Sequence, residues 1–197
     1  MKKCIAILVL LVLNLSFVNC SQNKKDKTIV LQPLGDFSSD EAKAILQKIA
    51  VVNPQTVLRK SIPFPKQSYN KLRNRYRADS LLTFLKHQIG EDEVIVGLSY
   101  KDISTTKGNH QDWGVMGLGN CPGNACVVSS FRLSKKKKSE QFYKVILHEL
   151  GHTQGLRHCL TKTCYMRDAQ GGNLVDYEKE FCKSCKKHLK EENWKLV

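Results

Sequence analysis

Short apolar runs alternate along the chain with segments in which apolar residues recur at helical spacing. Residues 28–34, 56–64, 94–100, 115–118 and 127–133 are rich in apolar or β-branched side chains, a pattern that predicts strands. Helical spacing appears in residues 42–49 and 78–89 and again in residues 139–155. Strands and helices thus alternate first, and a run of strands then precedes the last helix, an order that predicts an α/β domain with a mixed β-sheet.

The first predicted helix has a recognisable start. Ser38 is followed three positions later by Glu41, which makes a capping box, and Ala42 and Ile45 then begin the apolar face. The long last helix has Phe142 and Ile146 facing inward.

Residues 1–20 have the pattern of an export signal. Lys2 and Lys3 precede an apolar stretch that is short for a membrane span, and the segment ends in Asn19-Cys20-Ser21. We expect a bacterial lipoprotein-type signal peptide with Cys20 as the lipidated residue, although Asn19 also leaves ordinary secretion with cleavage nearby open. Residues 21–27 then form a polar linker and residues 28–197 a single domain. These features predict an exported protein of the cell envelope, anchored to the membrane through lipid on Cys20.

Composition adds a strong positive charge to an otherwise ordinary globular profile. The chain has 197 residues, 41% of them hydrophobic, with 32 Lys and Arg against 18 Asp and Glu. The net charge of +14 favours anionic membrane surfaces and acidic partners. No nucleic-acid recognition motif accompanies the basic runs, and residues 135–138 are typical of a solvated loop. We therefore expect no specific nucleic-acid binding, and a polyanion-binding surface protein is only a rival hypothesis.

The segment from His148 to His158 carries the clearest chemistry. It reads HExxHxxGxxH, and His148 and His152 are four residues apart, so they share one helix face and can bind one zinc ion. Gly155 can adopt a positive φ, which would end the helix and return the chain so that His158 supplies a third ligand. Three protein ligands leave the fourth zinc position open for water, which is typical of a catalytic site.

Glu149 follows the first histidine and can take a proton from a metal-bound water. The sequence therefore predicts a zinc metallopeptidase that hydrolyses peptide bonds, with Glu149 as general base. The alternative from another class is a lipid-anchored zinc-binding or interaction module that has little or no peptidase activity. The substrate, the endopeptidase or aminopeptidase mode and the oligomeric state stay open.

The eight cysteines divide into groups. Cys159 and Cys164 form one pair and Cys182 and Cys185 a second, together the four thiolates of a tetrahedral structural zinc site. Cys121 and Cys126 flank a short loop and could form a local disulfide in an exported protein. A further metal clip at that loop would lack partners at suitable spacing.

The motifs HELGHTQGLRHC (148–159), CYM (164–166) and CKSC (182–185) closely resemble the archaemetzincins, a branch of the metzincin metallopeptidases. The gap from Met166 to Cys182 is slightly shorter than usual in that family, which we interpret as a trimmed loop.

The resemblance implies an α+β metzincin-like fold with a long zinc-binding helix and a small cysteine-rich C-terminal segment. It also implies two zinc ions per chain, one catalytic on the three histidines and one structural on the four cysteines. Met166 would form a turn beneath the catalytic metal, the alternative being a free surface methionine. An edge strand within residues 113–132 would bind peptide substrate by strand addition, with the loop between Cys121 and Cys126 at the rim. Trp113 is then expected to pack in the core or at the rim.

Overall fold

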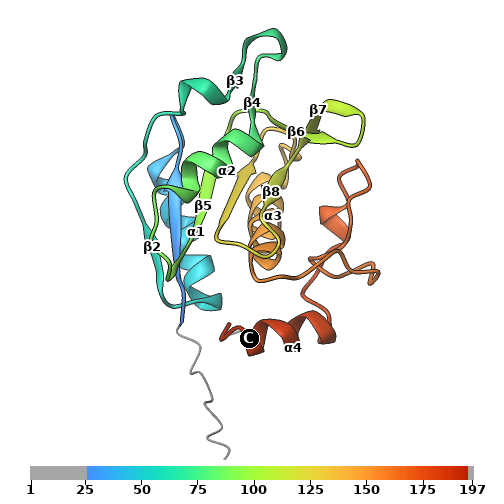
Figure 1. The fold of residues 1–197 in the computed structure, drawn as a ribbon. Coiled ribbons are helices and arrows are strands. Elements are labelled where there is room, and N and C mark those ends of the chain that lie inside the picture. Colours follow the sequence, from blue (N-terminus) through green and yellow to red (C-terminus); the bar gives the residue numbers. More distant parts are fainter. Residues whose placement is uncertain (1–25, 195–197) are drawn as a thin grey trace, which may run out of the picture.

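A computed structural model describes residues 26–194 of the chain, and its main element is a five-stranded sheet (Figure 1). The strand order is β2-β1-β5-β9-β8. The first four strands run parallel, and β8 pairs antiparallel with β9 at the edge of the sheet. The strands are β1 (Thr28–Pro33), β2 (Thr56–Leu58), β5 (Glu93–Ser99), β8 (Gly117–Gly119) and β9 (Ala125–Ser129). The predicted mixed sheet is therefore confirmed.

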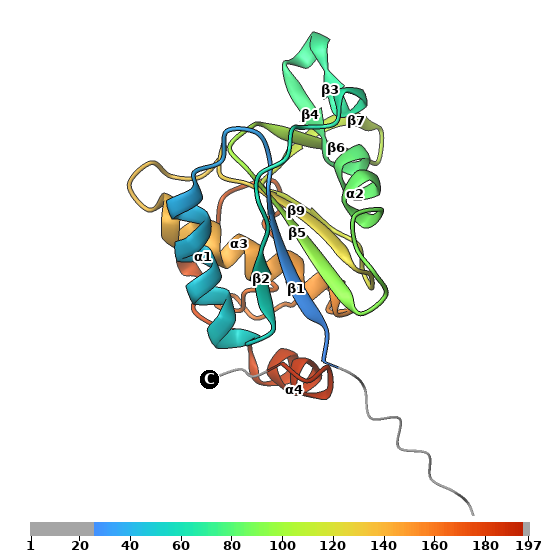
Figure 2. The same cartoon turned by 90° about the vertical axis from the view of Figure 1, so that its left-hand side faces the viewer.

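Helices cover both faces of this sheet (Figure 2). The helices α1 (Ser39–Val52) and α3 (Lys138–Thr153) lie on one face, and α2 (Ala78–Lys86) lies on the other. The alternation of side chains along β1 builds both cores, because Ile29 and Leu31 pack in the cluster with α1 and α3 while Val30 packs in the cluster with α2. These strands are apolar on both faces, as expected of parallel strands between helices.

A second, four-stranded sheet was not predicted from the sequence. Its order is β3-β4-β6-β7, and its strands are β3 (Tyr69–Asn70), β4 (Arg75–Arg77), β6 (Ile103–Lys107) and β7 (His110–Val115). Polar and charged residues occupy much of it, and some form ion pairs within the sheet, such as that between Arg77 Nη1 on β4 and Asp112 Oδ1 on β7 at 3.5 Å. Because these side chains are polar and paired with one another, no apolar alternation marked the strands.

Several predicted boundaries also differ from the structure. The strand expected over residues 56–64 ends at Leu58, after which only an isolated bridge joins Ile62 to Leu34. The strand expected over 127–133 ends at Ser129, and the last helix ends at Thr153 rather than at Gly155. The segment 115–118 spans the end of β7 and most of β8.

The start of α1 follows the capping prediction with one added partner. The Ser38 side chain accepts a hydrogen bond from the Glu41 backbone N–H at 3.3 Å. The other half of the box passes through Tyr100, whose hydroxyl accepts from the Ser38 N–H at 3.2 Å and donates to Glu41 Oε2 at 2.7 Å. The cap thereby joins α1 to the residue that follows β5.

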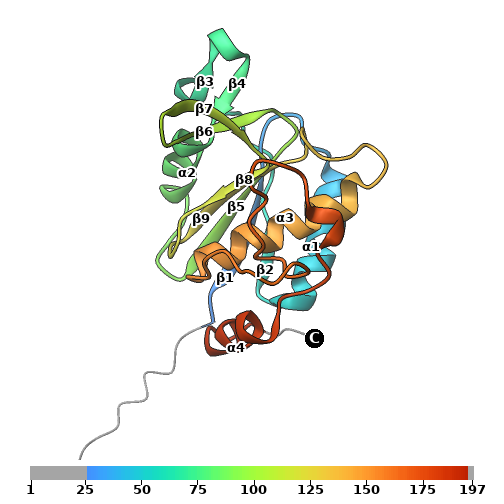
Figure 3. The same cartoon turned by 90° about the vertical axis from the view of Figure 1, so that its right-hand side faces the viewer.

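After α3 the chain runs back along the helix, passes through the short 3₁₀ helix η3 (Val175–Tyr177) and reaches α4 (Lys183–Glu191). Two further 3₁₀ helices, η1 (Lys66–Ser68) and η2 (Lys71–Arg73), lie between β2 and β4. Figure 3 shows α4 at the end of the molecule where β1 begins. Within residues 26–194 no helix is long and apolar enough to cross a membrane. The predicted signal peptide, Cys20 and most of the linker lie outside the described residues.

We expect Leu85→Ala to lower the free energy of unfolding by about 2–5 kcal/mol, because Leu85 is fully buried in α2 and its loss would leave a cavity against β5. Leu72→Ala is the matched control, since the same change falls on a side chain that is 96% exposed and should cost less than about 0.5 kcal/mol. Urea denaturation followed by circular dichroism measures both values. Equal losses in the two variants would contradict this description of the core.

Candidate active site

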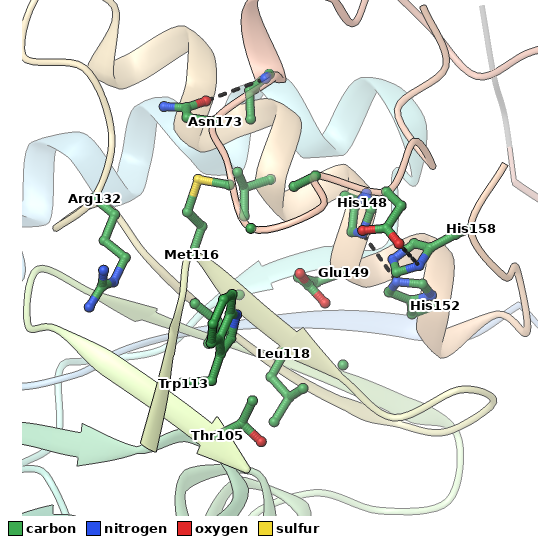
Figure 4. Close-up of a pocket in the computed structure, with 18 of the residues that line it drawn as sticks. Thr105, Trp113, Met116, Leu118, Arg132, His148, Glu149, His152, His158 and Asn173 are labelled. Atoms are coloured by element: carbon green, nitrogen blue, oxygen red, sulfur yellow. Dashed lines mark hydrogen bonds and ion pairs between the residues drawn. The ribbon is translucent and has the colours of Figure 1, made fainter. Parts of the chain in front are cut away.

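Three histidine rings converge at the C-terminal end of α3 (Figure 4). His148 and His152 come from the helix, and His158 comes from the loop that follows it. The Nε2 atoms of His148 and His152 are 3.1 Å apart, and one ring nitrogen from each histidine lies within 4.8 Å of the others. Two nitrogen ligands of a tetrahedral zinc ion are about 3.3 Å apart, so this donor set fits the metal.

Backbone carbonyls fix which nitrogen each helical histidine turns inward. His148 Nδ1 lies 2.6 Å from the Tyr165 carbonyl oxygen, and His152 Nδ1 lies 2.7 Å from that of Leu156. Because a carbonyl oxygen can only accept, each Nδ1 donates its hydrogen and each Nε2 presents a lone pair to the shared point. His158 Nδ1 is 3.6 Å from Asp168 Oδ2, which orients the third ring. Asp168 was not predicted, because no local motif marks it.

The two helical histidines, His148 and His152, are held in the neutral form that metal binding requires. Burial, with the charges of the neighbouring histidines, lowers the pKa of His148 to about 3. Burial also lowers the pKa of His152. Both rings are therefore uncharged at neutral pH, and their free nitrogens are available as ligands.

Gly155 makes the turn that brings His158 into the site. Its φ of +91° lies in the region that favours glycine, two residues after α3 ends at Thr153. The Leu156 N–H then donates to the Gly151 carbonyl at 3.0 Å, which closes the helix end. The predicted role of Gly155 in ending the helix and returning the chain agrees with this geometry.

Glu149 is buried between α3 and the edge strand β8. It is 6% exposed, and burial raises its pKa to about 8 in the protein chain alone. The strand passes so closely that a Cβ on Gly117 would lie 2.5 Å from Glu149 Oε1. Only glycine at this position leaves room for the carboxylate. A zinc ion at the histidines would lower the pKa of Glu149 again, because the positive charge stabilises the carboxylate.

An open cleft of about 610 Å³ runs past the histidines and Glu149. The strand β8 lines one side, and residues 167–178 after Met166 line much of the other. Since β8 is the last strand of its sheet, its outer edge faces the cleft, as expected of a strand that binds an extended peptide. Trp113 lies at the rim against Gly171, which agrees with its predicted packing role.

Met166 is fully buried and directly follows Tyr165, whose carbonyl binds His148. Its sulfur packs against α3 at Gly151, where a Cβ would lie 2.5 Å from Sδ. The Met166 carbonyl accepts a hydrogen bond from the Cys159 N–H at 2.7 Å. The alternative of a free surface methionine is therefore wrong.

The four C-terminal cysteines also converge. Cys159 Sγ lies 3.6 Å from Cys182 Sγ, and Cys164 Sγ lies 3.8 Å from Cys185 Sγ. Thiolates around a tetrahedral zinc ion are about 3.8 Å apart, so this set also fits the metal. Although burial alone would raise the pKa of Cys182, the Ser184 hydroxyl and the Cys185 N–H bring it to about 6, which favours the thiolate.

Cys121 and Cys126 do not form the disulfide that the sequence suggested, because both are free thiols. Cys126 is fully buried in β9 and lies near Glu149, and both effects raise its pKa. Cys121 is exposed at the rim of the cleft, where its thiol donates to the Leu156 carbonyl at 3.4 Å. The two side chains have different neighbours, since Cys121 lies in the loop after β8 beside Leu156, whereas Cys126 lies in β9 opposite Gly119.

Comparison with known proteins gives consistent results. The profile of "Peptidase family M54" matches residues 31–191. The archaemetzincin of Methanopyrus kandleri is 35% identical over 133 residues, covering 66% of this chain and 74% of the relative. That of Haloquadratum walsbyi is 30% identical over 173 residues, covering 80% and 96% respectively.

Solved structures agree with the sequence relatives. The crystal structure of the Methanopyrus kandleri archaemetzincin has a TM-score of 0.72 at 26% identity and covers 85% of this chain and 96% of the other. That of the Archaeoglobus fulgidus archaemetzincin, complexed with malonate, has a TM-score of 0.68 at 25% identity and covers 82% and 99%. Motifs, fold and site geometry therefore agree, and this chain belongs to peptidase family M54 as an archaemetzincin-type zinc metallopeptidase.

Proposed function

We propose that the protein hydrolyses peptide bonds in the cleft between α3 and β8, with Glu149 as the general base. The observation that carries this proposal is the position of Glu149, which is buried beside three histidine rings whose free nitrogens face one point. When bound there, zinc supplies a Lewis acid that acidifies a water molecule and polarises the scissile carbonyl.

Residues of the chain bind the substrate, transfer the proton and exclude solvent. The outer edge of β8 binds the extended substrate by backbone hydrogen bonds, which places the scissile carbonyl beside the histidines. Glu149 takes the proton of the attacking water and later passes it to the leaving amine. The close approach of Gly117 excludes solvent from one side of the carboxylate, so the proton stays between Glu149 and the reacting atoms.

We expect Glu149→Gln to keep its zinc but to cleave peptides roughly 100-fold more slowly or worse, because the amide has the same size and cannot accept the proton. The measurement is mass spectrometry of a diverse peptide mixture, together with metal analysis of the protein. Glu140→Gln is the matched control, since it makes the same change at an exposed position of the same helix and should keep full activity.

Each other outcome has its own meaning. Retained cleavage by Glu149→Gln would exclude the general-base role, and loss of zinc would make Glu149 a structural residue. Absence of cleavage by zinc-loaded wild type would favour the zinc-binding module without peptidase activity.

We also propose that each chain holds two zinc ions, the second on Cys159, Cys164, Cys182 and Cys185. The support is the tetrahedral spacing of the four sulfurs. These residues join the loop after α3 to the start of α4, two segments that also share backbone hydrogen bonds such as the one from the Tyr165 N–H to the Glu180 carbonyl at 3.0 Å. Zinc there would stabilise the folded C-terminal segment rather than take part in hydrolysis.

We expect Cys164→Ser to bind one zinc ion per chain instead of two and to unfold at a lower temperature, since Cys164 is a fully buried member of the set. Metal analysis and a thermal melt measure these effects. Cys121→Ser is the matched control and should keep both ions, because Cys121 lies outside the four-sulfur group. A count of two zinc ions in Cys164→Ser would contradict the assignment.

For localisation we propose an exported protein tethered through lipid on Cys20. The signal-like pattern of residues 1–20 supports it, and so does the position of α4. That helix carries Lys183, Lys187 and Lys190 as exposed residues at the end of the molecule where β1 begins. The linker before β1 would attach to the membrane through Cys20, so a basic helix at this end of the molecule would face the anionic membrane surface.

Cys20→Ala is expected to abolish incorporation of labelled fatty acid and to move the protein from the membrane to the soluble fraction of a bacterial host. Cys4→Ala is the matched control and should leave both unchanged, because Cys4 lies within the segment that is removed. Membrane association that survives Cys20→Ala without any label would point to attachment by charge alone.

A further inference from the structure

Glu178 is an ionisable residue of the cleft that the proposed reaction leaves without a role. It directly follows η3 and is 4% exposed. Among residues 26–194 its carboxylate has no hydrogen-bond or ion-pair partner. Burying a charged carboxylate without a partner is costly, so a chain that keeps one there has a use for it.

The exposed part of Glu178 faces the cleft. Glu178 is one of the residues that line the cleft. Within the described part of the chain its carboxylate oxygens have no partner, yet neither of them is completely shielded from solvent. The remaining accessible surface of an otherwise buried residue therefore includes the oxygens. A group that enters this part of the cleft can reach them.

This part of the cleft lies on the side where the leaving group departs. Val145 precedes Glu149 by about one helical turn on the cleft side of α3, away from His152. The segment with Val175 and Glu178 packs against that turn, as the 3.3 Å hydrogen bond from Lys144 Nζ to the Val175 carbonyl shows. Figure 4 places Glu149 between the histidines and the part of the cleft bordered by Met116. Because Glu149 gives its proton to the leaving amine, the first residue after the scissile bond lies on this side.

The walls suit a long side chain with a polar tip. Val145 and Val175 are apolar cleft residues that are 5% and 3% exposed, and Glu178 follows Val175 by one turn of chain. Lysine and arginine have apolar stems that pack on such walls and a cation at the end. We propose that Glu178 binds a basic side chain, lysine or arginine, at the first substrate residue after the scissile bond. This inference rests on the proposed peptidase function.

The cations that already lie near Glu178 have other partners. Lys144 Nζ lies 2.7 Å from Glu140 Oε1, and Arg167 Nη1 donates to the Lys162 carbonyl at 3.3 Å. Burial raises the pKa of Glu178 to about 7, although Lys144 and Arg167 oppose the shift. A substrate cation would complete the ionisation and form the missing ion pair.

The test uses two succinyl hydroxamates, whose hydroxamate binds the catalytic zinc and whose next side chain occupies the leaving-group side. The compounds differ only in that side chain, which is a four-carbon amine in one and a neutral butyl group in the other. Titration calorimetry at pH 8 with the zinc-loaded protein should give a Kd roughly tenfold lower for the amine. Glu178→Gln should bring the two Kd values together without changing that of the butyl compound by more than about twofold.

Glu180→Gln is the matched control. Glu180 lies two residues after Glu178, and its side chain is exposed and pairs with Lys186, so the substitution removes the same charge outside the cleft. It should keep the preference for the amine. Equal binding of both compounds by wild type, or an undiminished preference in Glu178→Gln, would overturn the proposal.

A measurement on wild type alone covers the case in which Glu178→Gln does not fold. Glu178 is charged above a pH of about 7 and protonated below it, while the amine stays charged throughout. The ratio of the two Kd values should therefore shrink between pH 8 and pH 6, and a constant ratio would count against Glu178. The groups that face this carboxylate are Lys144 on α3 and Arg167 and Tyr165 on the segment around Met166.

Peptide cleavage separates this inference from the proposed function. Cuts in a diverse mixture that show no enrichment of lysine or arginine after the broken bond would reject the role of Glu178 and leave the peptidase intact. A preference for the amine hydroxamate in a protein that cuts no peptide would keep the basic pocket and reject the hydrolysis.

Discussion

Two hydrogen bonds from α3 histidines to backbone carbonyls decide whether this site can exist. Each imidazole has two nitrogens. Because the Nδ1–H groups donate hydrogen bonds to the Tyr165 and Leu156 carbonyls, both Nε2 atoms point to one place. At 3.1 Å, two facing lone pairs repel unless a cation lies between them. The structure therefore carries a local cost that a metal ion relieves, and the neighbouring loop must be stiff enough to impose it.

The cysteine cluster supplies that stiffness. Tyr165 lies between Cys164 and Met166, both fully buried, so the carbonyl that orients His148 is fixed from either side. Leu156, whose carbonyl orients His152, also accepts from the Cys121 thiol at the cleft rim. The proposed structural zinc is thus connected to the catalytic site through one peptide unit. Loss of the structural zinc would loosen the catalytic site without changing any of the histidine ligands.

The sequence predicted those parts of the molecule whose physics is local. A capping box, three helical periodicities and apolar strands each follow from neighbours along the chain, and the motif around Glu149 follows from one turn of helix. The polar sheet of β3, β4, β6 and β7 escaped prediction because its side chains pair with residues distant along the chain, such as Arg77 with Asp112 at 3.5 Å. The orientation of His158 by Asp168 and the burial of Glu178 depend on the same long-range packing. A pairing of Cys121 with Cys126 was suggested by their spacing and by the expected export, whereas both thiols are free and Cys121 binds the Leu156 carbonyl.

Catalysis and selectivity are consequently located in different kinds of structure. The reacting groups lie on a rigid helix and on a turn fixed by Gly155, so one short stretch of chain, residues 148–158, supplies all of them. Selection of substrate depends on where the segment with Val175 and Glu178 packs against α3. This segment carries no motif. Its position is set by hydrogen bonds of Lys144 to the Val175 carbonyl and of Gln141 to Asp176. Small changes in that packing would alter which side chain fits beside Glu149 and leave the zinc ligands unmoved. A family can therefore keep one way of breaking a bond while its members differ in the bond they break.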